Sequence, residues 1–283
     1  MSGIEHRVET RGIVSPKYSE RKFTEEEIAS GAHRRFIGGH WDIHGLNQVN
    51  FLTHNGLRPE HKFLDVGCGP LRAGRYLVDL LMPGNYYGID ANLSLIKAGY
   101  EVELSDEQRS RLPVANLRAN DRFDCDFGVR FDMAIAQSVF THVSLNHIRL
   151  CLFRLGKVMR PGGTFFATFF EQPASTPFDK IIVRREGGRP FLNEQNVFWY
   201  HRSDLQWAST FGPWRFRYIG GWGHPAGQMM VAFTRLPDEE VTRPKAALAE
   251  GTRSRAAAAL RYKQMKRLVV RARRWAARRL DPY

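Results

Sequence analysis

A glycine turn between two short apolar runs constrains the fold of this chain more than any other feature of the sequence. The run Phe63–Val66 leads into a turn that holds Gly67 and Gly69, and the next apolar run, Tyr86–Ile89, ends at Asp90. Glycine lets the backbone adopt positive φ and approach a ligand closely. An acid at the end of the following parallel strand is placed to accept both hydroxyls of a ribose. The two runs therefore predict a strand–turn–helix–strand unit that binds a cofactor containing a nucleoside.

The spacing of the glycines and one nearby acid indicate which cofactor this is. A dinucleotide-binding turn has the pattern G-x-G-x-x-G, with a pyrophosphate at the helix N-terminus. Here the glycines are Gly67, Gly69 and Gly74, so the third falls two positions late. Asp65 adds a carboxylate beside the turn, which would repel a pyrophosphate but suits a ligand with an amino group or another cation. S-adenosylmethionine, with its amino group and sulfonium, fits this arrangement.

With these residues the chain resembles the class I S-adenosylmethionine-dependent methyltransferases over roughly Lys62 to Leu236. The resemblance implies an α/β fold, with a Rossmann-like, mostly parallel sheet of seven strands whose last strand is antiparallel. Five stretches carry it in the family's order: 63–70 (motif I), 86–92 (the acidic ribose motif), 117–123 (the strand end beside the adenine), 131–142 (motif IV and the helix after it) and 155–170 (the unit that closes the central sheet). Leu71 departs from the pattern, because many members carry a third glycine there.

The resemblance also implies which residues hold the donor. They follow the ends of the first four strands of the sheet: Asp65, Gly67, Cys68, Gly69, Asp90, Ala91, Asn92, Asn120, Asp121 and Gln137. Taken alone, a glycine turn is often only a tight turn, and an acid such as Asp90 can be only a helix N-cap. Met159–Gly163 can likewise be only a helix stop and a turn into a strand. All of these alternatives would have to hold together, in the order and spacing of the family's motifs, if the chain had no donor site.

Strands and helices alternate along the resembling region, which is typical of a parallel sheet. We expect strands at 62–66, 85–89, 114–119, 131–136, 163–170, 215–221 and 228–235, with the last two paired as an antiparallel hairpin. Residues 1–60 are expected to form a lid, 61–237 the methyltransferase domain and 238–283 a basic tail. Thr24 and Glu27 have the spacing of a capping box, and Ser203-Asp204 is expected to cap a later helix.

The charge of +13 is concentrated at one end of the chain. Thirteen of the 42 basic residues but only two of the 29 acids lie in 243–283. The nearly neutral remainder gives little reason to expect a nucleic-acid substrate. Apolar residues follow a helical spacing within 255–280. This tail is interpreted as a binder of an anionic membrane surface or polymer, as a helix that joins copies into a homo-oligomer, or as a solvated tail.

The composition indicates in which cellular compartment the protein works and whether it needs a metal. Cys68, Cys125 and Cys151 lack the spacing of a disulfide framework or a zinc site. No apolar run approaches the length of a membrane span, and no signal peptide is evident. We therefore expect a cytoplasmic protein, which the tail could hold at a membrane surface. Because no pair of acids or histidines has metal-ligand spacing at a strand end, we expect no metal.

Methyl transfer needs alignment of the acceptor and removal of its proton. His142, after the fourth strand on the first turn of the next helix, is the first candidate base, and His224, between the last two strands, is the second. His201 and Glu171 are weaker candidates. Two further histidines, His40 and His44, could close over the site from the lid or serve only as exposed polar lining. Packing or capping of the helix remains the alternative role for His142.

The classes of acceptor can be narrowed from the same region. The stretch after the fourth strand, Ala136–Val139, lacks the Asn/Asp-Pro-Pro-aromatic motif of enzymes that methylate nucleobase amines, and Cys125 and Cys151 do not fit a cytosine-C5 nucleophile. The sequence around His142, together with Arg160–Gly163, is similar to methyltransferases that modify glycans and other hydroxyl compounds. We therefore expect O-methylation of a small molecule or saccharide. A macromolecular acceptor (RNA, lipid or protein) held by the tail, and a binding module without catalysis, are the alternatives.

Overall fold

The computed structural model describes residues 6–7, 15–172, 182–183, 190–191 and 197–241 of the 283-residue chain. Contacts divide the chain into two units, 1–237 and 238–283. Of the second unit only the short helix α10 (Asp238–Val241) is described. The predicted tail helix and most of the irregular stretch between Glu171 and Tyr200 therefore lie outside the described residues.

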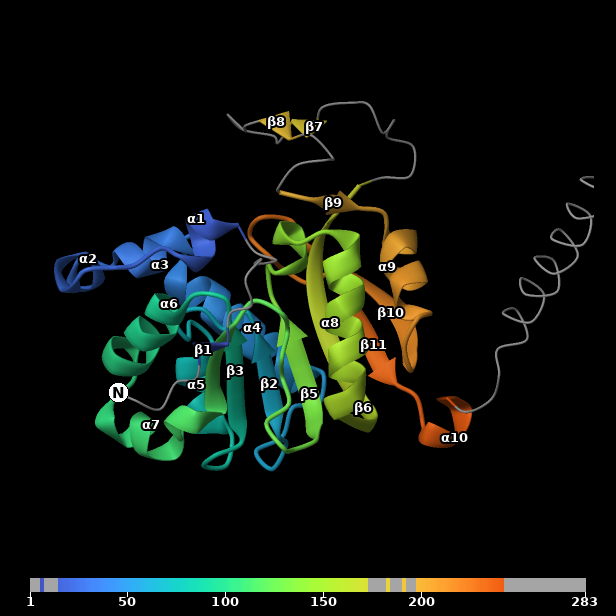
Figure 1. Ribbon diagram of the computed structural model, residues 1–283, viewed down its shortest axis with the longest axis horizontal. Coiled ribbons are helices and arrows are strands. Elements are labelled where there is room, and N and C mark those ends of the chain that lie inside the picture. The colour runs from blue at the N-terminus through green and yellow to red at the C-terminus, as the bar shows by residue number, and fades with distance from the viewer. Residues whose placement is uncertain (1–5, 8–14, 173–181, 184–189, 192–196, 242–283) are drawn as a thin grey trace, which may run out of the picture. The chain divides into compact units, whose positions relative to one another are not determined.

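One twisted sheet organises the first unit (Figure 1). In spatial order its strands are β1 (His6–Arg7), β4 (Leu117–Asn120), β3 (Tyr86–Asp90), β2 (Phe63–Val66), β5 (Phe131–Ala136), β6 (Met159–Glu171), β11 (Met229–Arg235) and β10 (Trp214–Gly221). A short strand, β9 (Trp199–Tyr200), pairs with the end of β6. Two further strands, β7 (Ile182–Val183) and β8 (Pro190–Phe191), pair only with each other.

The direction of the strands confirms the predicted Rossmann-like topology. The pairs from β4 through β6 are parallel, whereas β11 runs antiparallel to both β6 and β10. Strand bounds differ from the prediction by one residue at several ends and by more at two places. Residues 114–116 form a 3₁₀ turn before β4, and β6 begins at Met159, ahead of the glycines that were expected to precede it. The register against β5 is irregular between Met159 and Thr164, so the glycines lie within the strand.

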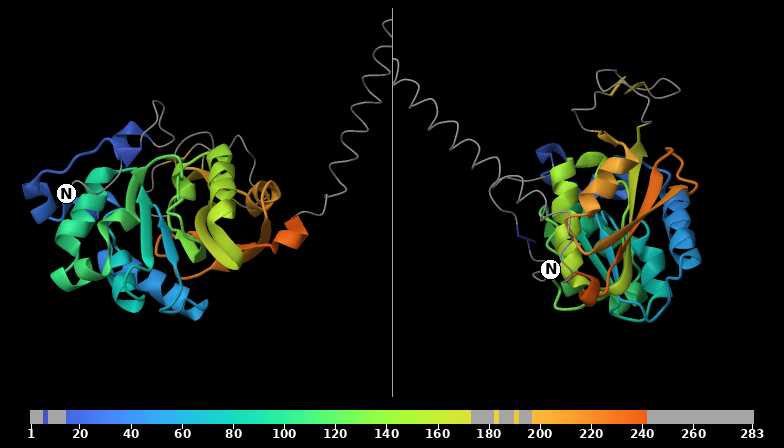
Figure 2. Two further views of the ribbon diagram at one scale, coloured as in Figure 1. Left: turned by 60° about the horizontal axis from the view of Figure 1, so that its bottom comes forward. Right: turned by 90° about the vertical axis from the view of Figure 1, so that its right-hand side faces the viewer.

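Helices cover both faces of the sheet (Figure 2). They are α1 (Pro16–Ser19), α2 (Glu25–Ala29), α3 (Ala32–Phe36), α4 (Trp41–His54), α5 (Gly74–Leu80), α6 (Leu93–Ala98), α7 (Asp106–Arg111), α8 (Leu145–Val158) and α9 (Arg202–Ser209), with a π-helical turn at Gly99–Glu103. The capping box at Thr24 is confirmed, because its hydroxyl and the Glu27 side chain exchange hydrogen bonds with each other's backbone. The N-cap of α9 is His201, two residues before the predicted Ser203, and the Asp204 carboxylate accepts from the His201 N–H.

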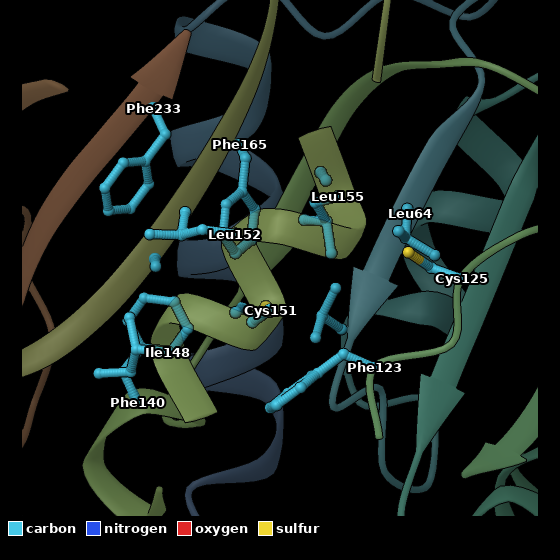
Figure 3. Close-up of a cluster of buried hydrophobic side chains, with 14 of the residues drawn as sticks. Leu64, Phe123, Cys125, Phe140, Ile148, Cys151, Leu152, Leu155, Phe165 and Phe233 are labelled. Carbon is cyan, nitrogen blue, oxygen red and sulfur yellow. The ribbon is translucent and has the colours of Figure 1, made fainter. Parts of the chain in front are cut away.

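The sheet separates two apolar cores. Residues of α8 and α9 pack on one face, and residues of α4, α5 and α6 pack on the other. Figure 3 shows part of the first core, where Leu152 and Phe165 lie close to Phe233. All three side chains are buried, and the rings of Phe165 and Phe233 stack at 5.8 Å. Each such side chain contributes about 1.5–3 kcal/mol when it is fully buried, so the cores fix the strand ends from which the site is built.

Within the described part of the chain, no helix combines the length and the apolar character needed to cross a membrane. The three cysteines are free thiols and all are buried.

Candidate functional site

A cavity of about 500 Å³ opens at the carboxyl ends of the central strands. This volume is in the range of small-molecule sites, and the position is where ligands bind in open α/β sheets. All but one of the predicted donor residues line the cavity, and both predicted catalytic histidines, His142 and His224, line it as well. The exception is Asn92, which lies outside the lining. The N-terminal segment contributes Tyr18, Phe36 and Ile37 to the wall.

The glycine turn after β2 requires glycine for two separate reasons. Gly67 and Gly69 have φ of 78° and 51°, which side chains rarely allow. A Cβ on Gly67 would also lie 2.4 Å from Cγ2 of Val139. The Gly67 and Cys68 N–H groups donate to the Ile89 carbonyl at 2.7 and 3.0 Å, which binds the turn to the end of β3. The turn therefore holds the backbone close to the cavity, in a form that only small residues fit.

Three non-glycine residues near this cavity have a left-handed backbone conformation. Leu71, Phe123 and Ser138 have φ of 59°, 57° and 59°. Leu71 is the position where many members of the family carry glycine, and its conformation explains that preference. Non-glycine residues adopt this region at a cost and are held there by their surroundings, often at functional sites. Phe123 and Ser138 both line the cavity.

Asp90, at the end of β3, is the predicted ribose ligand. Its buried carboxylate accepts from the Gly69 N–H at 2.9 Å and from the Asn92 N–H at 2.7 Å. The Tyr18 hydroxyl donates to it from 3.3 Å. Burial raises the pKa of Asp90 to about 6, although these hydrogen bonds oppose the rise. At neutral pH the group is largely ionised and is an acceptor for hydroxyl groups. Sequence reasoning did not find Tyr18, because it lies 72 residues away in the chain.

Asp65 lies one strand over, within β2, and is also buried. The Tyr86 hydroxyl donates to it at 2.9 Å. Burial raises its pKa to about 7; the neighbouring Asp90 adds to the rise, while the Tyr86 hydrogen bond and Arg72 oppose it. Arg72 lines the cavity beside it and was not among the predicted site residues.

Two asparagines serve the architecture of the site. Asn120 accepts from the Arg122 and Asp124 N–H groups at 3.2 and 2.8 Å and so builds the loop after β4. Asn92 caps α6 by accepting from the Leu95 N–H at 3.0 Å. Its amide also donates to the Tyr18 carbonyl at 2.6 Å. Asn92 therefore positions the N-terminal segment over the site from outside the cavity, whereas Asn120 shapes the loop that presents Asp121.

On the other side of the cavity the loop after β5 presents neutral polar groups. Gln137 is buried, and neither polar atom of its amide has a hydrogen-bond partner within the described residues. The Ser138 N–H donates to the Thr168 hydroxyl at 2.7 Å, and that hydroxyl donates to Oε1 of Gln228 at 2.6 Å. This network fixes the loop after β5 to β6 and to the β10–β11 connection.

His142 lies in a 3₁₀ turn, Phe140–His142, and not on the first turn of the following helix as expected, because α8 begins only at Leu145. Its side chain is exposed to solvent at the cavity wall. The turn is anchored at Thr141, whose hydroxyl donates to the Ser138 carbonyl at 2.9 Å. The backbone of Thr141 also accepts from the Phe198 N–H at 2.8 Å.

His224 lies in the connection between β10 and β11 and is buried. Its Nδ1 accepts from the Ala226 N–H at 3.1 Å. In a neutral imidazole that accepts through Nδ1, the proton is on Nε2, so we assign His224 as a donor there. Its ring lies 4.9 Å from that of His44 and 5.4 Å from that of Trp222.

His44 reaches the cavity from α4 and is buried, unlike the expected exposed polar lining. Burial, followed by the charge of Arg72, lowers its pKa to about 4, so it is neutral at physiological pH. His201 and Glu171 lie outside the cavity lining: His201 caps α9, and Glu171 accepts from the Tyr218 hydroxyl. Among the described residues no group of three or more His, Cys, Asp or Glu side chains could hold a metal ion.

The sequence and the fold of this chain are similar to those of known methyltransferases. Residues 64–165 match the family model described as a methyltransferase domain. CalS10, an amino pentose methyltransferase from Micromonospora echinaspora, is 19% identical with a TM-score of 0.50, over 76% of this chain and 98% of its own. DesVI from Streptomyces venezuelae is 16% identical with a TM-score of 0.52, over 77% and 100%. An S-adenosylmethionine-dependent methyltransferase from Clostridium acetobutylicum is 11% identical with a TM-score of 0.51, over 75% and 99%.

At these identities the solved structures establish the fold, and the matched domain establishes the activity. The protein is an S-adenosylmethionine-dependent methyltransferase of the Rossmann-like type, and S-adenosylmethionine is its methyl donor. The class of enzyme and its methyl donor were therefore predicted correctly from the sequence, and the residues assigned to the donor site stay a prediction.

Proposed function

We propose that the enzyme transfers a methyl group to a hydroxyl of a small molecule, such as a saccharide, with His142 as the group that accepts the proton. The observation that carries the proposal is the division of the cavity into two halves of different charge. Among the lining residues that the structure describes, the acids lie on the half built by β2, β3 and β4, and neutral hydrogen-bonding groups lie on the other half.

The acidic half suits the donor. The lining carboxylates there are Asp65, Asp90 and Asp121, each at or after the carboxyl end of a strand. The cradle at Gly67 leaves room for a ligand close to the backbone, as described above. S-adenosylmethionine supplies a methyl group that its positively charged sulfur activates toward a nucleophile. The residues of this half bind and orient that molecule.

The neutral half suits a hydroxylated acceptor. Its lining polar groups are those of His44, Gln48, Gln137, Ser138, Thr141, His142, His224 and Gln228. Within the described residues no carboxylate lines this half. A protonated amine would be bound best beside a carboxylate, whereas amides and neutral imidazoles both donate to and accept from hydroxyl groups. This favours a hydroxyl over an amino acceptor.

The two lining histidines differ in what they can do with a proton. His224, with its proton assigned to Nε2, is suited to donate to an acceptor oxygen and to orient it. His142, at the solvent-exposed wall, can take a proton and release it to water. Imidazole is the side chain that titrates near neutral pH, which suits it to this task.

An amino acceptor is the second candidate, because CalS10, which shares the fold, is an amino pentose methyltransferase. The two are separated by matched acceptors, each tested as the hydroxyl sugar and as its amino analogue, with the methylated atom located by mass spectrometry. We expect methyl transfer to oxygen. Methylation of the amino analogue alone would overturn the proposal.

The role of His142 is tested by His142→Ala and His142→Gln in the same assay. A positioned general base contributes about 10²- to 10⁴-fold, and we expect kcat to fall by this amount. His147→Ala is the matched control, since His147 lies five residues later, outside the cavity lining, with Nδ1 3.1 Å from the Ser144 hydroxyl. Unchanged turnover in His142→Ala would remove this residue as the base.

A further inference from the structure

Three large aromatic side chains are exposed together on the outer surface of α8 and α9. These two helices lie side by side on one face of the sheet (Figure 1). Phe153 of α8 is 53% exposed, Trp207 of α9 is 48% exposed, and Phe211, which follows α9, is 52% exposed. The rings of Trp207 and Phe211 meet edge to face at 4.9 Å. Apolar side chains that gather in the open on a folded domain mark an interaction surface.

Two cations join these rings into one surface. The Arg149 guanidinium lies over the rings of Trp207 and Phe211, at 5.1 and 4.0 Å from their centres. The Lys157 ammonium lies 4.3 Å from the centre of the Phe153 ring. Arg149, Phe153 and Lys157 are spaced by four residues and therefore follow one side of α8. We call these five residues, Arg149, Phe153, Lys157, Trp207 and Phe211, the aromatic–basic patch.

The two helices that carry the aromatic–basic patch leave its positive charge unbalanced. Within the described residues neither Arg149 nor Lys157 forms an ion pair. The sequence of α8 contains no acid, and that of α9 contains only Asp204, which accepts from the His201 N–H at the start of the helix. A partner that covers this surface must therefore supply negative charge as well as an apolar environment for the rings.

An anionic lipid bilayer supplies both. Lipid phosphates attract lysine and arginine, and each such residue near the surface strengthens binding about fivefold. Tryptophan and phenylalanine side chains insert at the boundary between the head groups and the acyl chains. We propose that the aromatic–basic patch docks the enzyme on an anionic membrane surface.

A second copy of the chain matches the patch less well. Two-fold symmetry places the same surface on both sides of a dimer interface. Arg149 and Lys157 of one copy would then lie close to the same cations of the other, and like charges brought together oppose association. A nucleic acid would supply negative charge, but it uses open aromatic faces for stacking. Arg149 already covers one face of the Phe211 ring.

Binding of the full-length protein to lipid vesicles tests the proposal. Vesicles of phosphatidylcholine mixed with phosphatidylglycerol are compared with vesicles of phosphatidylcholine alone in a sedimentation assay. Two double variants remove parts of the patch: Phe153→Ser with Lys157→Gln, and Trp207→Ser with Phe211→Ser. Met82→Ser and Arg58→Gln are the matched controls, because Met82 is 53% exposed and Arg58 is exposed, both outside α8 and α9.

We expect the native protein to bind the anionic vesicles at least about tenfold more tightly than the neutral ones. Each double variant should weaken binding to the anionic vesicles by about 10- to 50-fold. Both control variants should stay within about twofold of the native protein. Turnover on a small acceptor and the midpoint of thermal unfolding should be unchanged in every variant, since none of the replaced residues lines the cavity.

A fluorescent label shows which part of the protein contacts the vesicle. The three native cysteines are buried, so a cysteine introduced on the surface can be labelled selectively. Gln206→Cys places an environment-sensitive dye at an exposed position beside Trp207, and Met82→Cys is the control. We expect the dye emission to shift to the blue with anionic vesicles at position 206 and not at position 82. Vesicle binding without this shift would overturn the proposal, because another part of the chain would then make the contact.

Three other results would also overturn it. The first is unchanged affinity for the anionic vesicles in both double variants. The second is self-association in analytical ultracentrifugation that the Trp207→Ser, Phe211→Ser variant abolishes while vesicle binding persists, which would assign the patch to a second copy of the chain. The third is binding to a single-stranded oligonucleotide that both double variants lose while they keep vesicle binding, which would assign the patch to a nucleic acid.

Discussion

Replacing Asp65 with asparagine should stabilise the protein without its donor while weakening the donor complex. The carboxyl group is buried, and its pKa is raised from 3.8 to about 7, chiefly by burial. Between these two values the folded protein keeps a proton that the unfolded chain has released. The free energy of unfolding therefore falls as pH rises through this window and levels off above about pH 7. The full rise corresponds to about 4 kcal/mol.

Asparagine removes the charge and keeps the shape, and its amide oxygen can still accept from the Tyr86 hydroxyl. The free energy of unfolding of Asp65→Asn should therefore exceed that of the native protein increasingly as pH rises. From pH 5 to pH 8 the difference should grow by about 3 kcal/mol. Urea unfolding without ligand at a series of pH values measures it.

Asp132→Asn is the control for loss of a carboxylate. Asp132 accepts from the Lys62 N–H and from Arg160, both at 2.8 Å, so its replacement should give no stabilisation at high pH. If Asp65→Asn were no more stable than the native protein at pH 8, the ionised carboxylate would not be strained in the empty site. The argument that Asp65 awaits a cationic partner would then fail.

Three further predictions test the cradle, the core and the tail. Gly67→Ala should destabilise the fold by about 1–3 kcal/mol more than Gly84→Ala, because both positions have positive φ but only Gly67 would place a Cβ 2.4 Å from Val139; equal losses in urea unfolding would contradict this. Leu152→Ala should lower the free energy of unfolding by about 2–5 kcal/mol. A loss below about 1 kcal/mol would mean that the surrounding core closes the space left by the leucine side chain. Deletion of 242–283 should leave donor affinity and turnover on a small acceptor unchanged, since the residues that line the cavity lie in the first unit; a large loss of turnover would favour the macromolecular acceptor held by the tail.

The sequence alone determined the features that depend on short stretches of chain. Gly67 and Gly69 marked a turn that needs positive φ, and Asp90 marked the end of the next buried strand. These signals are local, because backbone conformation and strand periodicity depend on residues close in sequence. The strand order followed from them once the family resemblance was recognised, and the antiparallel β10–β11 hairpin followed from the short connection between its strands.

The tertiary structure decided which charged and polar groups face one another. The sequence could not show that Tyr18 reaches Asp90, or that His44 lies beside His224, because each pair joins residues from distant elements. The sequence also gave no sign that Arg72 lines the cavity. Whether a charge is paired depends on neighbours within a few ångströms, and those neighbours are brought together only when the chain folds.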